Sequence, residues 1–333
     1  MKNILFTNNL SLGDVVVCTA AIRDLHKAHP GKFKTGYRGS ASVLFNNNPY
    51  IHDFGNDLSG VETIRLEYPA IHTSNSRPVH FIEAYHEFLS DRLGVKIPVT
   101  DFKGDIHLSH DELKWTNQVE SIVRYDIPFW IILSGGKFDF TCKWWGADNY
   151  QKVVDTLKEE VLFVQAGAGD HNHPPLKGVI DLRDKTDVRQ LVRLVHHSSG
   201  VLCPVTGMMH LAAAVPCRAG NFPTRPCVVV AGGREPVSWE HYPSHQFLHT
   251  QGMLPCCHGG GCWKSRVAPL DDGSKQDASL CKIPEVTNAG VIPKCMDMIK
   301  PYDVVNAIRK YIYGGAAPSM NQAMLKEALK HVT

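Results

Sequence analysis

Residues 201–215 read VLCPVTGMMHLAAAV, and this stretch decides the fold. Its opening run, VLC, is apolar and has the length of a buried parallel strand, and Pro204 and Gly207 then interrupt the apolar pattern. Thr206 is a good N-cap residue for a helix that begins at Met208. The stretch therefore predicts a strand, a tight turn and a helix, the repeating unit of an α/β sheet.

The turn in this stretch is suited to binding phosphate. A helix that starts directly after a strand leaves free backbone N–H groups pointing at one spot, and the helix dipole adds to their attraction for an anion. Gly207 lets a ligand approach the backbone, and His210, one turn into the helix, can point at the same ligand. The alternative is an ordinary strand–turn–helix corner that binds nothing, and these residues leave both interpretations open.

The composition narrows the class of protein. A chain of 333 residues exceeds one core of usual size, so we expect two domains. The 35 Lys and Arg against 33 Asp and Glu argue against a dedicated nucleic-acid binder. No apolar run approaches the length of a membrane span, and the start, MKNILFTNN, is typical of a first strand rather than a signal peptide. We therefore expect a cytoplasmic protein, in which ten cysteines indicate metal binding or packing before disulfides.

Strand-like and helix-like segments alternate along the chain, which predicts doubly wound parallel sheets, one in each half. The second half begins at residue 128, directly before a buried-type strand at residues 129–133. Residues 253–298 break this rhythm, because they hold five cysteines and show little periodicity. A last helix is expected at residues 303–312, with one apolar face.

Leu12-Gly13-Asp14 follows the first predicted strand, residues 3–7. Ligands of such sheets sit outside the carboxyl ends of the strands. A carboxylate at this place can accept a proton from a hydroxyl in the cleft, so Asp14 is a candidate general base. The simpler interpretation is that Asp14 only caps the helix that follows.

The loop from Ser134 to Trp145 leaves the first strand of the second half. Gly135 and Gly136 permit a close approach of the backbone, and Lys143 carries a point charge suited to a phosphate. The adjacent Trp144 and Trp145 are expected to anchor the loop in the core.

Four segments together resemble a known family. They are LGDVVVCTAAIRDLHKAHP, NNNPYI, KWWGADNY and IDLRDKTDVRQLVRLVHHSSGVLCPVTGMMHLAAAV, and their order and spacing are similar to those of the ADP-heptose heptosyltransferases of glycosyltransferase family nine. The resemblance extends from residue 1 to about residue 313. It implies the GT-B fold, in which two Rossmann-like domains face a cleft, and an inverting sugar transfer without a catalytic metal, as in lipopolysaccharide biosynthesis.

The resemblance also implies how the chain is divided. Residues 1–127 would form the acceptor domain, and residues 128–300 the donor domain with an insertion at residues 253–298. Residues 301–333 would form a helix that returns to the N-terminal domain, followed by a tail.

Site residues follow from the same motifs. Asp14 takes the place of the family's catalytic base, and Lys143 takes the place of its phosphate-binding lysine. One position departs from the pattern, because Val205 stands where the family's loop usually has Asp, so any contact through that carboxylate is absent. The residues expected to bind the donor are Gly13, Gly135, Gly136, Lys143, Thr206, Gly207, Met208, His210 and Glu235.

Two further loops lie near the donor in this family. Arg234 or Glu235 would hold sugar hydroxyls, although a solvated turn fits these residues equally well. Asp170, His171 and His173 sit on the loop where family members usually meet the adenosine ribose. Their pattern could also suggest a metal, but a rigid loop is the preferred interpretation because no fourth ligand is evident.

The cysteines of residues 253–298 suggest a structural metal site. Cys257 and Cys262 flank His-Gly-Gly-Gly, and thiolates at such a turn together with distant thiolates can close a tetrahedral site that suits Fe or Zn. The segment also resembles the iron-holding cysteine finger of the autotransporter heptosyltransferases, a subgroup that glycosylates protein serines. The alternative is reduced cysteines that pack separately. The candidate ligands are Cys256, Cys257, Cys262, Cys281 and Cys295.

The expected reaction needs an ADP-sugar donor, most simply ADP-heptose, and an acceptor hydroxyl. Glycan, lipid-linked sugar and protein hydroxyls all remain open as acceptors. A different class also stays open, a non-catalytic nucleotide- or metal-binding module on the same fold. Val205 favours that alternative, whereas Asp14 and Lys143 argue against it. A nicotinamide oxidoreductase is disfavoured, because no GxGxxG follows the first strand.

Overall fold

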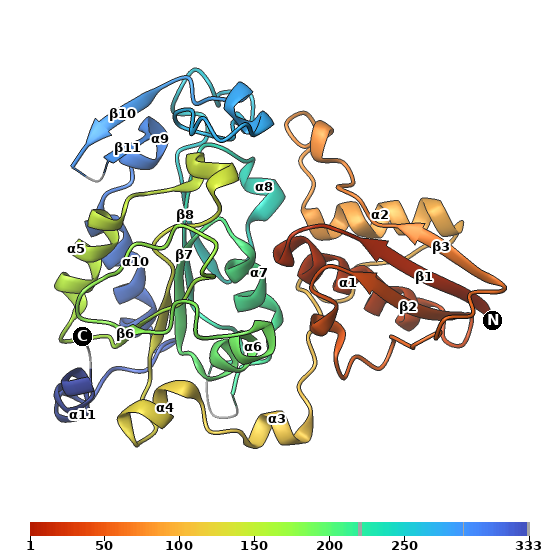
Figure 1. The fold of residues 1–333 in the computed structure, drawn as a ribbon, viewed down its shortest axis with the longest axis horizontal. Helices are drawn as coiled ribbons and strands as arrows, with labels where there is room; N and C mark the ends of the chain where they lie inside the picture. Colours follow the sequence, from red (N-terminus) through yellow and green to blue (C-terminus); the bar gives the residue numbers. More distant parts are fainter. Residues whose placement is uncertain (219–221, 289, 332–333) are drawn as a thin grey trace.

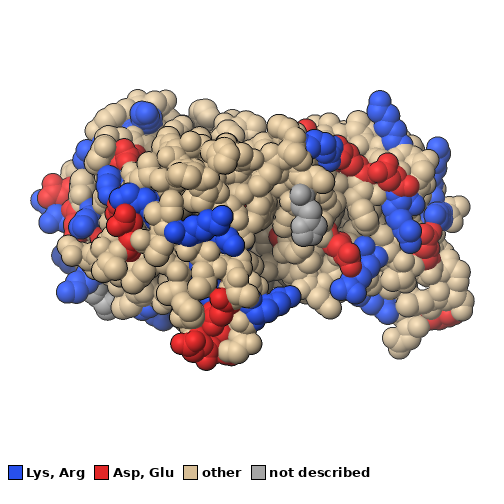
Figure 2. Space-filling model, turned by 90° about the horizontal axis from the view of Figure 1, so that it is seen from above, with Lys and Arg blue, Asp and Glu red and all other residues tan. Residues whose placement is uncertain are grey.

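The computed structural model describes residues 1–218, 222–288 and 290–331. Two parallel sheets organise these residues into two lobes that lie side by side (Figure 1). Charged side chains are scattered over both lobes on the face seen in Figure 2, as the nearly balanced charge of the sequence predicts. Among the described residues, no helix combines the length and the apolar character that a membrane span requires.

The first sheet has three parallel strands in the order β2-β1-β3. They are β1 (Lys2–Asn8), β2 (Phe33–Gly39) and β3 (Val61–Arg65). Helices α1 (Leu12–Ala28) and α2 (Phe81–Leu93) pack against each other in this lobe. The sheet is smaller than the predicted doubly wound domain, because the connection from β2 to β3 contains only the 3-10 turn η1 (Ser42–Phe45) and no α-helix.

The second sheet has six parallel strands in the order β6-β5-β4-β7-β8-β9. Alternate residues of one strand enter different cores, since Ile131 packs in one apolar cluster and Trp130 and Ile132 pack in another. Both faces of the sheet are therefore buried, as expected for a parallel sheet. The strands are β4 (Trp130–Ile132), β5 (Phe163–Gln165), β6 (Ile180–Asp181), β7 (Gly200–Pro204), β8 (Cys227–Gly232) and β9 (His245–His249), and the helices among them are α5 (Ala147–Leu157), α6 (Val188–His197), α7 (Gly207–Ala214) and α8 (Val237–Glu240).

The predicted strand–turn–helix stretch is confirmed as β7 and α7. Thr206 is the N-cap of α7, and its hydroxyl accepts a hydrogen bond from the Met208 N–H at 3.4 Å. The start of α7 meets the start of α1 from the other lobe. A Cβ atom added to Gly13 would lie 2.9 Å from the Gly207 Cα and 2.8 Å from the His210 Cδ2, so no larger residue fits there.

The segment that connects the lobes is attached to the second one. It contains α3 (His110–Lys114) and α4 (Gln118–Val123), which run beneath the second lobe in Figure 1. Arg189 of α6 forms an ion pair of 2.5 Å with Glu112. Glu112 also accepts a hydrogen bond of 2.9 Å from the Asn47 side chain of the first lobe.

The last predicted helix is found, but its expected packing on the first domain is wrong. It forms α10 (Pro301–Tyr313), which packs on α5 and β8 of the second lobe. Its buried residues, Val304, Val305, Ala307 and Ile308, belong to the core on that face of the six-stranded sheet. The reason is that this face is apolar and otherwise covered only in part, so the helix buries its own apolar side there. The following α11 (Gln322–Ala328) contacts the segment that connects the lobes, where the hydroxyl of Tyr125, just after α4, donates to the Met324 carbonyl at 2.7 Å.

The cysteine-rich segment forms a small irregular unit beside the second sheet. It contains the turn η4 (Lys275–Ala278), an antiparallel hairpin of β10 (Pro284–Thr287) and β11 (Gly290–Pro293), and the short α9 (Lys294–Asp297). Arg266, which is 1% exposed, pairs with Asp277 at 2.6 Å and with Asp272 at 2.8 Å. These ion pairs hold together a segment that has little apolar core.

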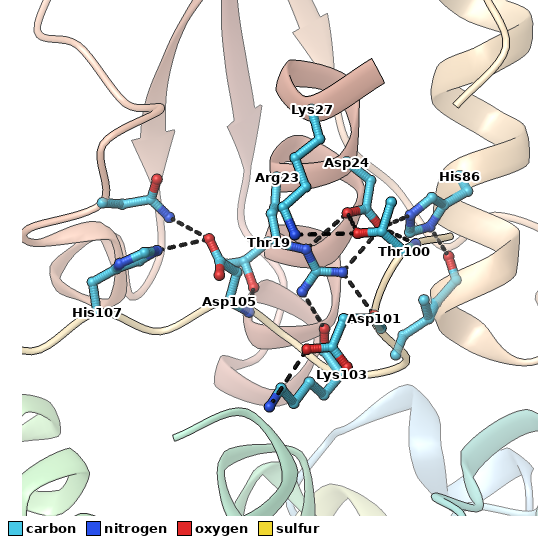
Figure 3. A network of polar contacts seen from close by, with 12 residues as sticks. Thr19, Arg23, Asp24, Lys27, His86, Thr100, Asp101, Lys103, Asp105 and His107 are labelled. Atoms are coloured by element: carbon cyan, nitrogen blue, oxygen red, sulfur yellow. Dashed lines mark hydrogen bonds and ion pairs between the residues drawn. The ribbon is translucent and has the colours of Figure 1, made fainter. Parts of the chain in front are cut away.

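A buried polar network holds residues 100–105 against the first lobe (Figure 3). The fully buried Asp24 accepts hydrogen bonds from Arg23 Nε at 2.8 Å and from the Thr100 backbone N–H at 3.0 Å. The His86 Nε2 lies 2.8 Å from the same carboxylate. Arg23 also donates to the carbonyls of Asp101 and Lys103. The pKa of Asp24 is lowered, because these hydrogen bonds outweigh the opposing effect of burial.

Replacing Asp24 by Ala should therefore destabilise the fold strongly. It would leave the Arg23 guanidinium and His86 buried without their partner, which typically costs about 3–5 kcal/mol. Asp101→Ala is the matched control, because its side chain makes only a solvent-exposed ion pair with Lys103, worth about 1 kcal/mol at most. Urea unfolding of both variants measures the difference. Equal losses would show that the network does not stabilise the lobe.

Candidate functional site

A cavity of about 680 Å³ lies between the two lobes. Its walls come from segments that follow β1, β3, β4, β5, β7 and β8, so it sits at the carboxyl ends of both sheets. This is where ligands bind in open α/β folds. Every residue predicted to be catalytic or to bind the donor lines the cavity: Gly13, Asp14, Gly135, Gly136, Lys143, Thr206, Gly207, Met208, His210 and Glu235.

Asp14 lies in the first turn of α1 with its carboxylate in the cavity wall. Its Oδ2 accepts the Ser11 backbone N–H at 2.9 Å, so Asp14 does help to cap α1, but as the N3 residue of a capping box in which Ser11 is the N-cap. The same Oδ2 accepts the Tyr68 hydroxyl at 2.5 Å. Burial raises the pKa of Asp14, while the Tyr68 hydrogen bond and His210 oppose this rise. A carboxylate with a raised pKa is better suited to take up a proton than an exposed one.

His210 is buried beside Gly13, and both of its ring nitrogens face protein groups. The Nδ1 lies 2.8 Å from the Tyr242 hydroxyl, and the Nε2 lies 3.0 Å from Glu240 Oε2. The imidazole therefore joins α7 to α8, and its nitrogens are held by these two residues. Glu240 also lines the cavity, which places a second carboxylate near Asp14.

Lys143 ends the 3-10 segment η3 (Phe138–Lys143), and its Nζ lies 2.8 Å from Glu235 Oε1. Arg234 pairs with the same carboxylate. Burial would raise the pKa of Glu235, but Lys143 and Arg234 outweigh it, so the pKa is lowered. Its other oxygen, Oε2, is buried and accepts no hydrogen bond from any residue that the structure describes. This atom is the unsatisfied acceptor of the cluster.

The glycines after β4 fit tightly against the loop after β5. The Gly136 N–H donates to the Asn172 carbonyl at 3.0 Å, and a Cβ on Gly135 would lie 2.0 Å from that same oxygen. Burial lowers the pKa of His173 to about 4, and His171 adds to the effect. The rigid-loop interpretation of this His-Asn-His segment therefore fits its packing.

The cysteine-rich segment encloses a second, very small cavity of about 10 Å³. Gly233 is pressed against it, since a Cβ there would lie 3.0 Å from the Cys257 Sγ. Within the described ranges, no group of three or more His, Cys, Asp or Glu side chains is arranged to hold a metal ion. The cavity is lined by all five predicted cysteines and by a sixth: Cys142, Cys256, Cys257, Cys262, Cys281 and Cys295.

Sequence reasoning missed several residues of both cavities. Cys142 is remote in sequence from the other five cysteines, and its only signal is that it precedes Lys143. Tyr68 and Glu240 carry no motif, because the fold alone brings them to Asp14. Asn75 was also missed, although its side-chain amide exchanges two hydrogen bonds with the Gly261 backbone, at 2.8 and 3.0 Å. It thereby ties the first lobe to the cysteine-rich segment.

Several solved glycosyltransferases have a fold similar to that of this chain. The iron-containing dodecameric glycosyltransferase TibC of enterotoxigenic E. coli H10407 is 19% identical, with a TM-score of 0.63 over 94% of this chain and 76% of TibC. E. coli ADP-heptose lps heptosyltransferase II is 13% identical, with a TM-score of 0.56 over 95% of this chain and 100% of that chain. A family 9 glycosyltransferase of Veillonella parvula DSM 2008 is 17% identical, with a TM-score of 0.57 over 75% and 86% of the two chains.

These likenesses agree with the expected GT-B arrangement of two parallel-sheet domains. A comparison with curated proteins finds no match. The family model described as glycosyltransferase family 9 (heptosyltransferase) matches residues 31–219, which is more than half of the chain. The chain therefore belongs to glycosyltransferase family 9 and is a glycosyltransferase of the heptosyltransferase type.

Proposed function

We propose that this enzyme transfers heptose from ADP-heptose to an acceptor hydroxyl, with inversion, in the cavity between its lobes. The observation that carries the proposal is that Asp14 and Lys143, contributed by different lobes, line one cavity at the start of α7. The choice of ADP-heptose as the sugar donor is supported by two solved structures of similar fold. TibC has been solved in complex with ADP-D-beta-D-heptose, and E. coli heptosyltransferase WaaC with ADP.

The second lobe would hold the donor. The diphosphate would lie against the start of α7, where the helix dipole favours an anion. Lys143 would offset the charge that develops on the leaving diphosphate. The unpaired Oε2 of Glu235 would accept a hydrogen bond from a sugar hydroxyl, which gives this buried atom the partner that it lacks.

The first lobe would activate the acceptor. No donor among the described residues hydrogen-bonds Asp14 Oδ1, so this oxygen is left for the acceptor hydroxyl. As the proton moves to Asp14, the acceptor oxygen forms a bond to the anomeric carbon. The bond from that carbon to the diphosphate breaks on the opposite face, and its electron pair leaves with ADP. The enclosing walls would keep water from competing with the acceptor.

We also propose that the cysteine-rich segment binds a structural Fe or Zn ion. TibC, which is similar in fold, is described as iron-containing. The candidate ligands fit such an ion, because six cysteine thiols and no carboxylate line the small cavity. The thiols would have to turn inward, since they do not form a ligand arrangement as they stand. Cys142 lines the small cavity and Lys143, the next residue in the sequence, lines the large one, so the metal site would lie next to the donor site.

Asp14→Asn should reduce turnover about 10²–10⁴-fold, the usual worth of general-base catalysis. Asn keeps the size of the side chain, and its amide oxygen can still accept the Ser11 N–H, so the thermal midpoint and the affinity for ADP should change little. The release of ADP from ADP-heptose measures the turnover, and the thermal midpoint and the affinity for ADP are measured on the same variant as controls. Turnover within threefold of the wild type would move the base elsewhere.

Lys143→Ala should weaken ADP binding, because a hydrogen bond to a charged group is worth about 1.5–3 kcal/mol. That corresponds to an increase in the ADP dissociation constant of about 10- to 100-fold. Lys2→Ala is the control, because Lys2 begins β1 at the end of the strand away from the cavity, does not line the cavity, and forms an exposed ion pair with Glu62. Calorimetric titration with ADP measures both variants. Unchanged affinity in Lys143→Ala would place the diphosphate elsewhere.

Protein purified without chelator should contain about one equivalent of Fe or Zn per chain, measured by elemental analysis. Cys262→Ala should lower both the metal content and the thermal midpoint, because a structural metal contributes folding energy. Cys18→Ala is the matched control, a buried cysteine of α1 far from the segment. Less than a tenth of an equivalent in the wild type would overturn the proposed metal site.

A further inference from the structure

One phenol of the first lobe touches the carboxylate assigned as the base. Tyr68 follows β3, and its hydroxyl donates to Asp14 Oδ2 at 2.5 Å. We propose that Tyr68 is a positioning residue, which holds Oδ2 so that Oδ1 faces the acceptor and which keeps the base in its carboxylate form. This inference rests on the proposed role of Asp14 as the general base.

The Tyr68 ring is held by an aromatic row that crosses between the lobes. Tyr68 stacks on Phe81 of α2 with ring centroids 5.9 Å apart, and Phe81 stacks on Trp239 of α8 at 4.6 Å. Phe81 and Trp239 are almost fully buried, whereas Tyr68 remains 41% exposed. A ring this exposed adds little to the core, and a Phe could make the same stacking contact. The hydroxyl is thus the part of the side chain that packing does not explain.

The hydrogen bond also has a fixed direction. Burial raises the pKa of Tyr68, and the neighbouring Asp14 raises it further, so the phenol stays protonated and can only donate to the carboxylate. Together with the Ser11 N–H it gives Oδ2 two donors, which favour the charged form of Asp14.

Other charged groups near Asp14 also affect its pKa. His210 of α7 lowers the pKa of Asp14, whereas Glu240 of α8 raises it. Glu235, after β8, acts on Tyr68. A Tyr68→Phe substitution leaves all three in place, so its effect reports on the hydroxyl alone.

Tyr68→Phe removes a hydrogen bond that lowers the pKa of Asp14, so that pKa should rise. The base is active only when deprotonated, and the acid limb of kcat/KM should therefore move to higher pH. We expect a shift of about one pH unit, which is about a tenfold loss below the limb. The probe is the slow hydrolysis of ADP-heptose without an acceptor, in which water takes the place of the acceptor hydroxyl and the release of ADP is followed as a function of pH. The KM for ADP-heptose and the thermal midpoint should stay near the wild-type values.

Tyr85→Phe is the matched control. Tyr85 belongs to the same aromatic row, with its ring centroid 5.0 Å from that of Phe81, but its buried hydroxyl makes no hydrogen bond within the described part of the chain. Its loss should leave the pH profile unchanged. A Tyr68→Phe profile that superimposes on the wild type, or an equal shift in Tyr85→Phe, overturns the inference. If Asp14→Asn keeps its turnover, the proposed base itself fails, so the two failures are distinguishable.

Discussion

The meeting of two helix starts at Gly13 and Gly207 is the contact on which the arrangement of the site depends. A Cβ on Gly13 would lie 2.9 Å from the Gly207 Cα, and a Cβ on Gly207 would lie 3.0 Å from the Gly13 N, so the backbones of the two lobes are in close contact. Because α1 follows β1 and α7 follows β7, this contact brings the carboxyl ends of both sheets to one cavity. A larger residue at Gly13 would push the two lobes apart and move the side chains of each lobe away from those of the other.

The same contact has an electrostatic consequence. The starts of α1 and α7 both carry partial positive charge, and two like dipole ends that face each other are unfavourable unless anions lie between them. Asp14 supplies one negative charge in the first turn of α1, and Glu240 supplies another beside His210. The opposing helix starts therefore favour both a retained carboxylate and an anionic ligand in the same cavity.

Much of the fold and of the site could be predicted from the sequence because both depend on local patterns. The stretch at residues 201–215 specifies a buried strand and a capped helix by itself, and every predicted donor residue follows a strand end. The partners supplied by tertiary packing could not be predicted in this way. Tyr68 and Cys142 have no local signature, and the apolar face of α10 is equally compatible with either lobe until the uncovered face of the second sheet is known.

The attachment of the connecting segment determines how the lobes can move. Glu112 is bonded both to Arg189 of the second lobe and to Asn47 of the first, at the point where the chain crosses between them. A side chain bonded on both sides opposes a relative movement of the lobes at that place, which favours a rotation about an axis near Glu112. Opening of the cavity then resembles a hinge rather than a sliding of one lobe over the other. Such an opening would first have to break the two hydrogen bonds between Asn75 and the Gly261 backbone, which join the first lobe to the cysteine-rich segment.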